Sequence, residues 1–179
     1  IASVDNWCAF GTAWWTAMDE DGGGQIFQMA PFEARDQQFA SLTDAQHDKL
    51  LDRLIGIVNV HVPVLFASGA SLTSVSSIPL EQDPYFTRLE ICAQTASQVA
   101  AAIAIDEKVE MFIEEEKRFV GRAAEIMTDL RAQDKHLGPV AFPNKHESIQ
   151  LQAADLFVWT ARNEYRRRVF NPNAPQHAA

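Results

Sequence analysis

The stretch that decides the fold is Val109-Glu110-Met111-Phe112-Ile113-Glu114-Glu115-Glu116. Four of its first five residues are apolar, and the run stops abruptly at three glutamates. A short run that is apolar on both faces is typical of a central strand that helices cover on each side. The stretch therefore predicts a buried strand whose carboxyl end carries Glu114.

Helical patterns flank this strand along the chain. Helices are predicted where apolar residues recur at spacings of three and four, over 3–21, from 43 onward, and over 83–103, 119–131 and 149–169. Extended segments are predicted at 25–29, at 139–142 and at 58–66, where valines alternate with other residues. Because helices alternate with strands, the sequence predicts an α/β fold.

The chain has 179 residues, which fits one domain better than two. We expect a single domain over 1–170 and a disordered tail over 171–179, where Asn171-Pro172 ends the last helix. No window holds the ~20 unbroken apolar residues that cross a bilayer. The opening residues have neither the basic nor the apolar region of a signal peptide, so we expect a cytoplasmic protein without membrane contact.

The net charge of −9 argues against broad attraction to nucleic acid. It does not exclude an enzyme that acts on nucleic acid, because a cluster of metal-binding carboxylates is itself acidic. The positive charge is uneven, since four of the 15 basic residues are gathered near the C-terminus: Arg162, Arg166, Arg167 and Arg168.

Two acids stand out by their position in the predicted elements. Glu114 follows a buried strand, and ligands of open α/β sheets bind just beyond such strand ends. Asp155 lies between Ala-Ala and Leu-Phe in a predicted helix, so its charge needs a partner. A divalent cation shared by both carboxylates would supply one, since Mg²⁺ prefers oxygen ligands and keeps waters for a phosphate substrate.

Each of these residues also has a purely structural interpretation. Asp155 could pair with Arg162 or cap a local element. Glu114 belongs to a charge run, which is usually a solvated turn, and Glu33 could be an ordinary first-turn helix residue. The four arginines could be a solvated helix end that complements the helix dipole.

A resemblance adds to these patterns. The segment Ser148-Ile149-Gln150-Leu151-Gln152-Ala153-Ala154-Asp155-Leu156 resembles the closing motif of a mostly bacterial family called domain of unknown function 3800, in which a helix carries Leu-Gln-x-Ala-Asp-Leu. Three stretches are similar to other family elements, in the same order: Trp7 to Glu33, Asp83-Pro84-Tyr85-Phe86, and Phe112 to Ala123. The resemblance covers nearly the whole chain. It implies a ribonuclease H-like mixed sheet flanked by helices and, by analogy, a metal-dependent nuclease.

By this resemblance Asp155, Glu114 and Glu33 are catalytic acids, and Asp155 and Glu114 hold Mg²⁺ or Mn²⁺. Arg162 and Arg166, beyond Asp155 on roughly its face of the helix, are the predicted nucleic-acid contacts. The family begins with a strand carrying Asp-Glu-Ser-Gly, which this sequence lacks, so we expect a chain whose first strand is missing. The alternative is a catalytically inactive ribonuclease H-like module that binds or regulates. A different α/β enzyme has little support, because the sequence has no P-loop, Gly-x-Ser-x-Gly elbow or zinc spacing.

Overall fold

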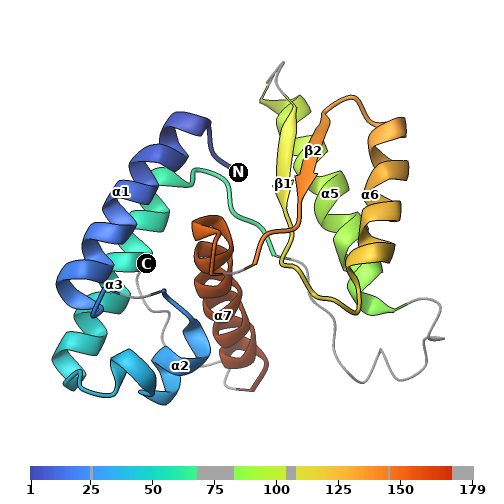
Figure 1. The fold of residues 1–179 in the computed structure, drawn as a ribbon. Coiled ribbons are helices and arrows are strands. Elements are labelled where there is room, and N and C mark those ends of the chain that lie inside the picture. The colour runs from blue at the N-terminus through green and yellow to red at the C-terminus, as the bar shows by residue number, and fades with distance from the viewer. Residues whose placement is uncertain (25, 68–82, 104–107, 145, 171–179) are drawn as a thin grey trace. The chain divides into compact units, whose positions relative to one another are not determined.

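The computed structural model describes residues 1–24, 26–67, 83–103, 108–144 and 146–170 (Figure 1). Its elements are α1 (Val4–Asp21), α2 (Met29–Ala34), a 3-10 helix η1 (Gln37–Phe39), α3 (Asp44–His61), α5 (Pro84–Ala102), β1 (Val109–Phe112), α6 (Val120–Gln133), β2 (Leu137–Ala141) and α7 (Ile149–Phe170). The predicted tail over 171–179 lies outside the described residues.

The chain divides into two compact units. Ile1–Leu65 and Ile149–Ala179 form the first, which we call the helical unit because its described elements are α1, α2, η1, α3 and α7. Phe66–Ser148 form the second, which we call the sheet unit.

The predicted ribonuclease H-like mixed sheet is wrong. Helices make up 67% of the structure, and the described residues form only a two-stranded parallel sheet, β1 beside β2. The predicted strand at 58–66 is absent, because α3 continues through His61 and the residues after it pair with no strand. The extended piece around Phe27 is bound by side chains of α7 and not by another strand.

The sheet unit is built on a β1–α6–β2 crossover, the connection that parallel strands require. Val109 pairs with Leu137 and Met111 with Val140, so β2 carries one extra residue between these pairs. The irregularity falls at Gly138 and Pro139. A Cβ on Gly138 would lie 3.1 Å from the Val109 carbonyl oxygen, so a larger residue would require the strands to shift by a few tenths of an ångström.

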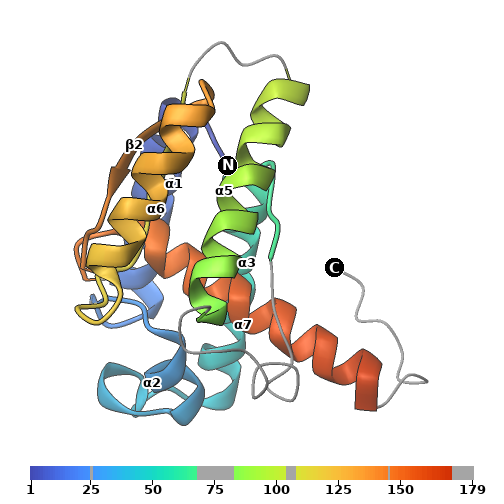
Figure 2. The ribbon, with the colours of Figure 1, turned by 90° about the vertical axis from the view of Figure 1, so that its right-hand side faces the viewer.

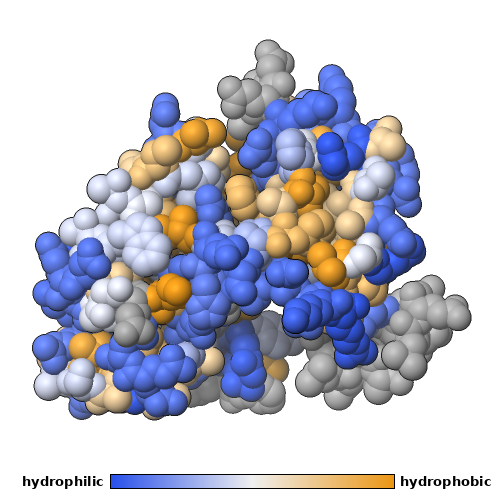
Figure 3. Space-filling model, viewed as in Figure 1, coloured by the Kyte–Doolittle hydropathy of each residue, from blue (hydrophilic) through white to orange (hydrophobic). Residues whose placement is uncertain are grey.

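Helices α5 and α6 cover one face of this sheet. The buried core there consists of Leu89, Ala93, Ile113, Ala123, Met127 and Leu137. Burial alternates along β1, and Phe112 on its other face is 39% exposed. Figure 3 shows apolar side chains gathered over the strands on the viewed face. The strand at 109–112 is therefore present as the sequence predicts, but it is covered on one face only.

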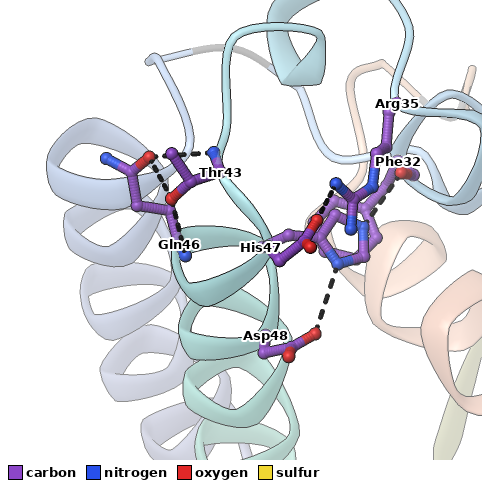
Figure 4. Close-up of polar contacts among 7 residues, drawn as sticks. Phe32, Arg35, Thr43, Gln46, His47 and Asp48 are labelled. Carbon is purple, nitrogen blue, oxygen red and sulfur yellow. Dashed lines mark hydrogen bonds and ion pairs between the residues drawn. The ribbon is translucent and has the colours of Figure 1, made fainter.

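The helical unit packs α1 against α3, with α2 and α7 completing its core. Helix α1 begins after Ser3, whose hydroxyl oxygen accepts a hydrogen bond from the Asn6 amide at 3.2 Å. Helix α3 begins after Thr43, which forms a reciprocal capping box with Gln46 (Figure 4). Both helix starts confirm the sequence prediction. No helix in the described ranges is long and apolar enough to span a membrane.

Ion pairs at Asp21 join α1 to α3 and make the stability of the helical unit depend on pH. The carboxylate accepts hydrogen bonds from Lys49 at 2.7 Å and Arg53 at 2.6 Å, which hold the pKa of Asp21 below its ordinary value of 3.8. The stabilisation is therefore complete above that value and is lost as pH falls through the lowered folded-state pKa. We expect Asp21→Asn to make acid unfolding less steep. Denaturant titrations of both proteins between pH 2 and pH 7 measure this, and identical pH profiles would contradict it.

Candidate functional site at the α2–α7 contact

Two side chains of α7 hold the extended segment that leads into α2. Gln152 is fully buried, and its Oε1 accepts hydrogen bonds from the Trp14 indole nitrogen at 3.2 Å and the Phe27 amide at 3.1 Å. Asp155 Oδ2 accepts from the Met29 amide at 2.9 Å. Amides two residues apart in an extended chain point the same way, and residues three apart on a helix share a face. The spacing of the Phe27 and Met29 amides therefore corresponds to the spacing of Gln152 and Asp155 on α7, so each side chain can accept one of these hydrogen bonds.

Asp155 therefore lies where the chain turns into α2. The half-buried carboxylate binds the amide of the first residue of that helix, and a negative charge at a helix N-terminus is favourable. Asp155 is thus a helix cap, but of a helix 126 residues away in sequence and not of a local element. An ion pair with Arg162 is not observed in the described residues.

Glu33 lies on α2, one turn after Met29, and belongs to the same contact. It is exposed, and its Oε2 accepts a hydrogen bond from the Trp159 indole nitrogen at 2.9 Å. The pairs Met29–Asp155 and Glu33–Trp159 are each four residues apart on both helices. The two helices thus run in the same direction here, and the two hydrogen bonds follow one another at about one turn, or roughly 6 Å of helix rise.

Contacts with α3 fix α2 in place behind this pair of acids. The His47 ring stacks on Phe32, with ring centroids 3.8 Å apart, and its Nε2 lies 3.1 Å from the Phe32 carbonyl oxygen (Figure 4). Arg35, just after α2, pairs with Asp44 at the start of α3. The helix that carries Glu33 is therefore held from both sides.

Glu114 lies in the sheet unit, two residues after β1, and is exposed. Its neighbourhood is acidic. The pKa of Tyr85 is raised, first by burial and then by the negative charges of Glu114 and Glu116. Because Glu114 and Asp155 belong to different units, the predicted sharing of a cation between them stays a prediction.

The arginines of α7 fall into two groups. Glu164 pairs with Arg167 and Arg168, each at 2.6 Å, which lowers the pKa of its carboxyl to about 2. Arg162 and Arg166 are exposed and take part in no hydrogen bond or ion pair within the part of the chain that the structure describes. Arg167 and Arg168 thus lie in the last turn of α7 as an ion-paired group, with the Arg167 side chain 17% exposed, whereas Arg162 and Arg166 are exposed.

Glu33 and Asp155 are the two carboxylates of the α2–α7 contact, and oxygen is the ligand that Mg²⁺ and Mn²⁺ prefer. In the described ranges no group of three or more His, Cys, Asp or Glu side chains could hold a metal ion. Mg²⁺, however, is commonly bound by one or two carboxylates together with waters and substrate phosphates. Two carboxylates, each already accepting a hydrogen bond, do not make a closed structural site, and a cation here would need waters or a phosphate for its remaining ligands.

Sequence reasoning missed two residues of this contact. Trp159 is the donor that positions Glu33, and Gln152 is the buried acceptor one turn before Asp155. A signal was present for Gln152, because a glutamine within an apolar helical stretch must satisfy its amide. No family model, curated protein or solved structure matches this chain, so the resemblance noted from sequence stays a prediction.

Proposed function

We propose that this chain forms part of a metal-dependent phosphodiester hydrolase, a nuclease in which α7 supplies both the cation site and the phosphate contacts. One observation carries the proposal. At 100° per residue, Arg162 and Arg166 lie within about 20° of Asp155 around α7. One face of a single helix therefore presents a carboxylate followed by two arginines that have no described partner, with Glu33 alongside on α2.

The residues divide the work by their chemistry. Asp155 and Glu33 would hold Mg²⁺ or Mn²⁺. Such an ion, when bound, polarises a phosphodiester and lowers the pKa of a water that attacks phosphorus. Arg162 and Arg166 would bind neighbouring phosphate oxygens, each with a planar guanidinium suited to two parallel hydrogen bonds. The backbone amide of Met29 keeps the Asp155 carboxylate oriented.

A second candidate is a binding module without catalytic activity. Both acids at the α2–α7 contact already accept hydrogen bonds, Asp155 from Met29 and Glu33 from Trp159. The net charge of −9 also weakens general attraction to nucleic acid. A thermal-melting titration separates the two candidates, since a cation that binds the folded chain raises its melting temperature. A metal-binding hydrolase should respond to millimolar Mn²⁺ and a module without a cation site should not.

Removing the two unpaired arginines tests the phosphate contacts. We expect Arg162→Ala with Arg166→Ala to slow Mn²⁺-dependent cleavage of a labelled oligonucleotide roughly 10- to 100-fold, because two charge-assisted hydrogen bonds are lost. The matched control is Arg167→Ala with Arg168→Ala, which removes the same charge from residues already paired with Glu164. Equal losses in both double variants would show a general charge effect and contradict specific contacts.

A further inference from the structure

The second half of α7 does not pack on either hydrophobic core of the described residues. Trp159 is the last residue of α7 that packs on the buried cluster of the helical unit, and none of residues 160–169 is buried. Figure 2 shows this part of α7 leading away from the other helices of its unit. Helical stability usually comes from packing one face against a partner. Within the described residues this stretch is at most half-buried, so we ask which molecule its exposed face would suit.

The charge of this stretch is opposite to that of the chain. Residues 160–170 hold four arginines and one glutamate, a net charge of +3, whereas the whole chain carries −9. The one glutamate among these residues, Glu164, forms ion pairs with Arg167 and Arg168. A polyanion repelled by the rest of the surface would be attracted here, because surface fields act over about 10 Å at moderate salt.

Apolar side chains are interleaved with the arginines. Tyr165, Val158 and Val169 are 61%, 57% and 50% exposed. At 100° per residue, these three lie with Arg162 and Arg166 inside one arc of about 100°. Tyr165 thus shares one face of the helix with Arg162 and Arg166.

We propose that this arc, made by Val158, Arg162, Tyr165, Arg166 and Val169, binds single-stranded nucleic acid, with an unpaired base stacked on Tyr165 and phosphates on the arginines. An exposed aromatic ring beside cationic side chains is the arrangement that binds single strands without sequence preference. A duplex fits poorly, because its bases already stack on each other and hide their faces. The inference deepens the proposed function by naming its substrate class, and it rests on the same face of α7.

The pattern disfavours two other occupants. A helix that lies on a membrane separates its apolar face from its charged face, and here insertion of Tyr165 and Val169 would bury Arg162 and Arg166 beside them. A second copy of the chain packed along this arc would bring four arginines together, and like charges in contact destabilise an interface.

Binding measured without metal separates this inference from the proposed hydrolase. The probes are three labelled oligonucleotides: a 20-mer of dT, a 20-mer of rU and a 20-base-pair duplex. Binding of each to the protein is measured by fluorescence anisotropy in the presence of EDTA. We expect both single strands to bind more tightly than the duplex, and the dT and rU arms to show whether the sugar matters. Tyr165→Ala should weaken single-strand binding roughly 5- to 100-fold, whereas Tyr165→Phe, which keeps the ring, should retain it.

The arginines provide a second readout. Arg162→Ala with Arg166→Ala should reduce the dependence of log K on log salt by about 1.4, since each phosphate contact to a single strand contributes about 0.7. The control Arg167→Ala with Arg168→Ala should reduce it less, and circular dichroism verifies that α7 remains helical. Equal duplex binding, or an unchanged affinity in Tyr165→Ala, would overturn the inference. So would Tyr165-dependent dimerisation, or binding to vesicles with 30% anionic lipid in place of the oligonucleotides. Single-strand binding without Mn²⁺-dependent cleavage would support this surface and reject the hydrolase.

Discussion

Replacing Gln152 with alanine should lower the free energy of unfolding of the helical unit by about 2–4 kcal/mol. The side chain is fully buried and is the acceptor for both the Trp14 indole and the Phe27 amide. Each buried donor left without an acceptor costs about 1–3 kcal/mol. The native protein already bears one such cost, because Gln152 Nε2 has no partner among the described residues. Alanine removes this unpaired amide nitrogen as well, so part of the lost stability is regained. The expected destabilisation is therefore smaller than the combined cost of leaving the Trp14 and Phe27 donors without an acceptor.

Gln152→Met is the matched control for this prediction. Methionine preserves most of the volume, so it separates the lost hydrogen bonds from the loss of packing. Both variants are measured by urea denaturation followed through tryptophan fluorescence, because Trp14 is one of the two donors. If both lose less than about 0.5 kcal/mol, which is the range of ordinary surface substitutions, Gln152 does not hold the segment in place.

The local elements of this chain were largely predictable from sequence. Ser3 and Thr43 begin helices as expected, because a hydroxyl oxygen that caps a free amide acts within a few residues. The strand that starts at Val109 and the one that ends at Ala141 are also present. These features depend on neighbours in sequence, which a pattern can report directly.

The segment after Ile57 shows why the sheet was not predictable. Its alternating valines have a period of two, but α3 already carries Leu50, Leu54 and Val58 at helical spacing. Val58 and Val62 are both 5% exposed, whereas Val60 between them is 74% exposed. Burial thus follows the period of four. A β-branched residue fits either structure, and tertiary packing decided in favour of the helix.

Sequence reasoning singled out the two acids of the candidate site, but neither their contacts nor the residues Gln152 and Trp159. A charged residue in an apolar stretch needs a partner, which is why the sequence singles out Asp155. The partner of its carboxylate is the Met29 amide. Backbone amides carry no sequence signature, so this partner, 126 residues away, could not be found by pattern. The bond from the Trp159 indole to Glu33 spans the same separation, and a local sequence pattern does not report contacts between residues so far apart.

Asparagine at position 155 should separate the structural role of this residue from its proposed chemical role. The amide oxygen of asparagine can still accept the hydrogen bond from Met29, so Asp155→Asn should change the free energy of unfolding by less than about 1 kcal/mol. It removes the charge that a hard cation needs. Loss of an outer-shell partner of a metal ligand costs about 10- to 100-fold. We therefore expect loss of a ligand itself to lower Mn²⁺-dependent cleavage at least about 100-fold.

Asp155→Ala is the comparison that decides between the two roles, because it removes the cap together with the charge. It should lose about 1–2 kcal/mol of stability as well as cleavage, since a charge-assisted hydrogen bond at a half-buried position disappears. Melting curves with and without Mn²⁺ on all three proteins measure both effects. If Asp155→Asn melts and cleaves like the native chain, Asp155 is only a helix cap. The acids of the α2–α7 contact would then position α2 without binding a cation.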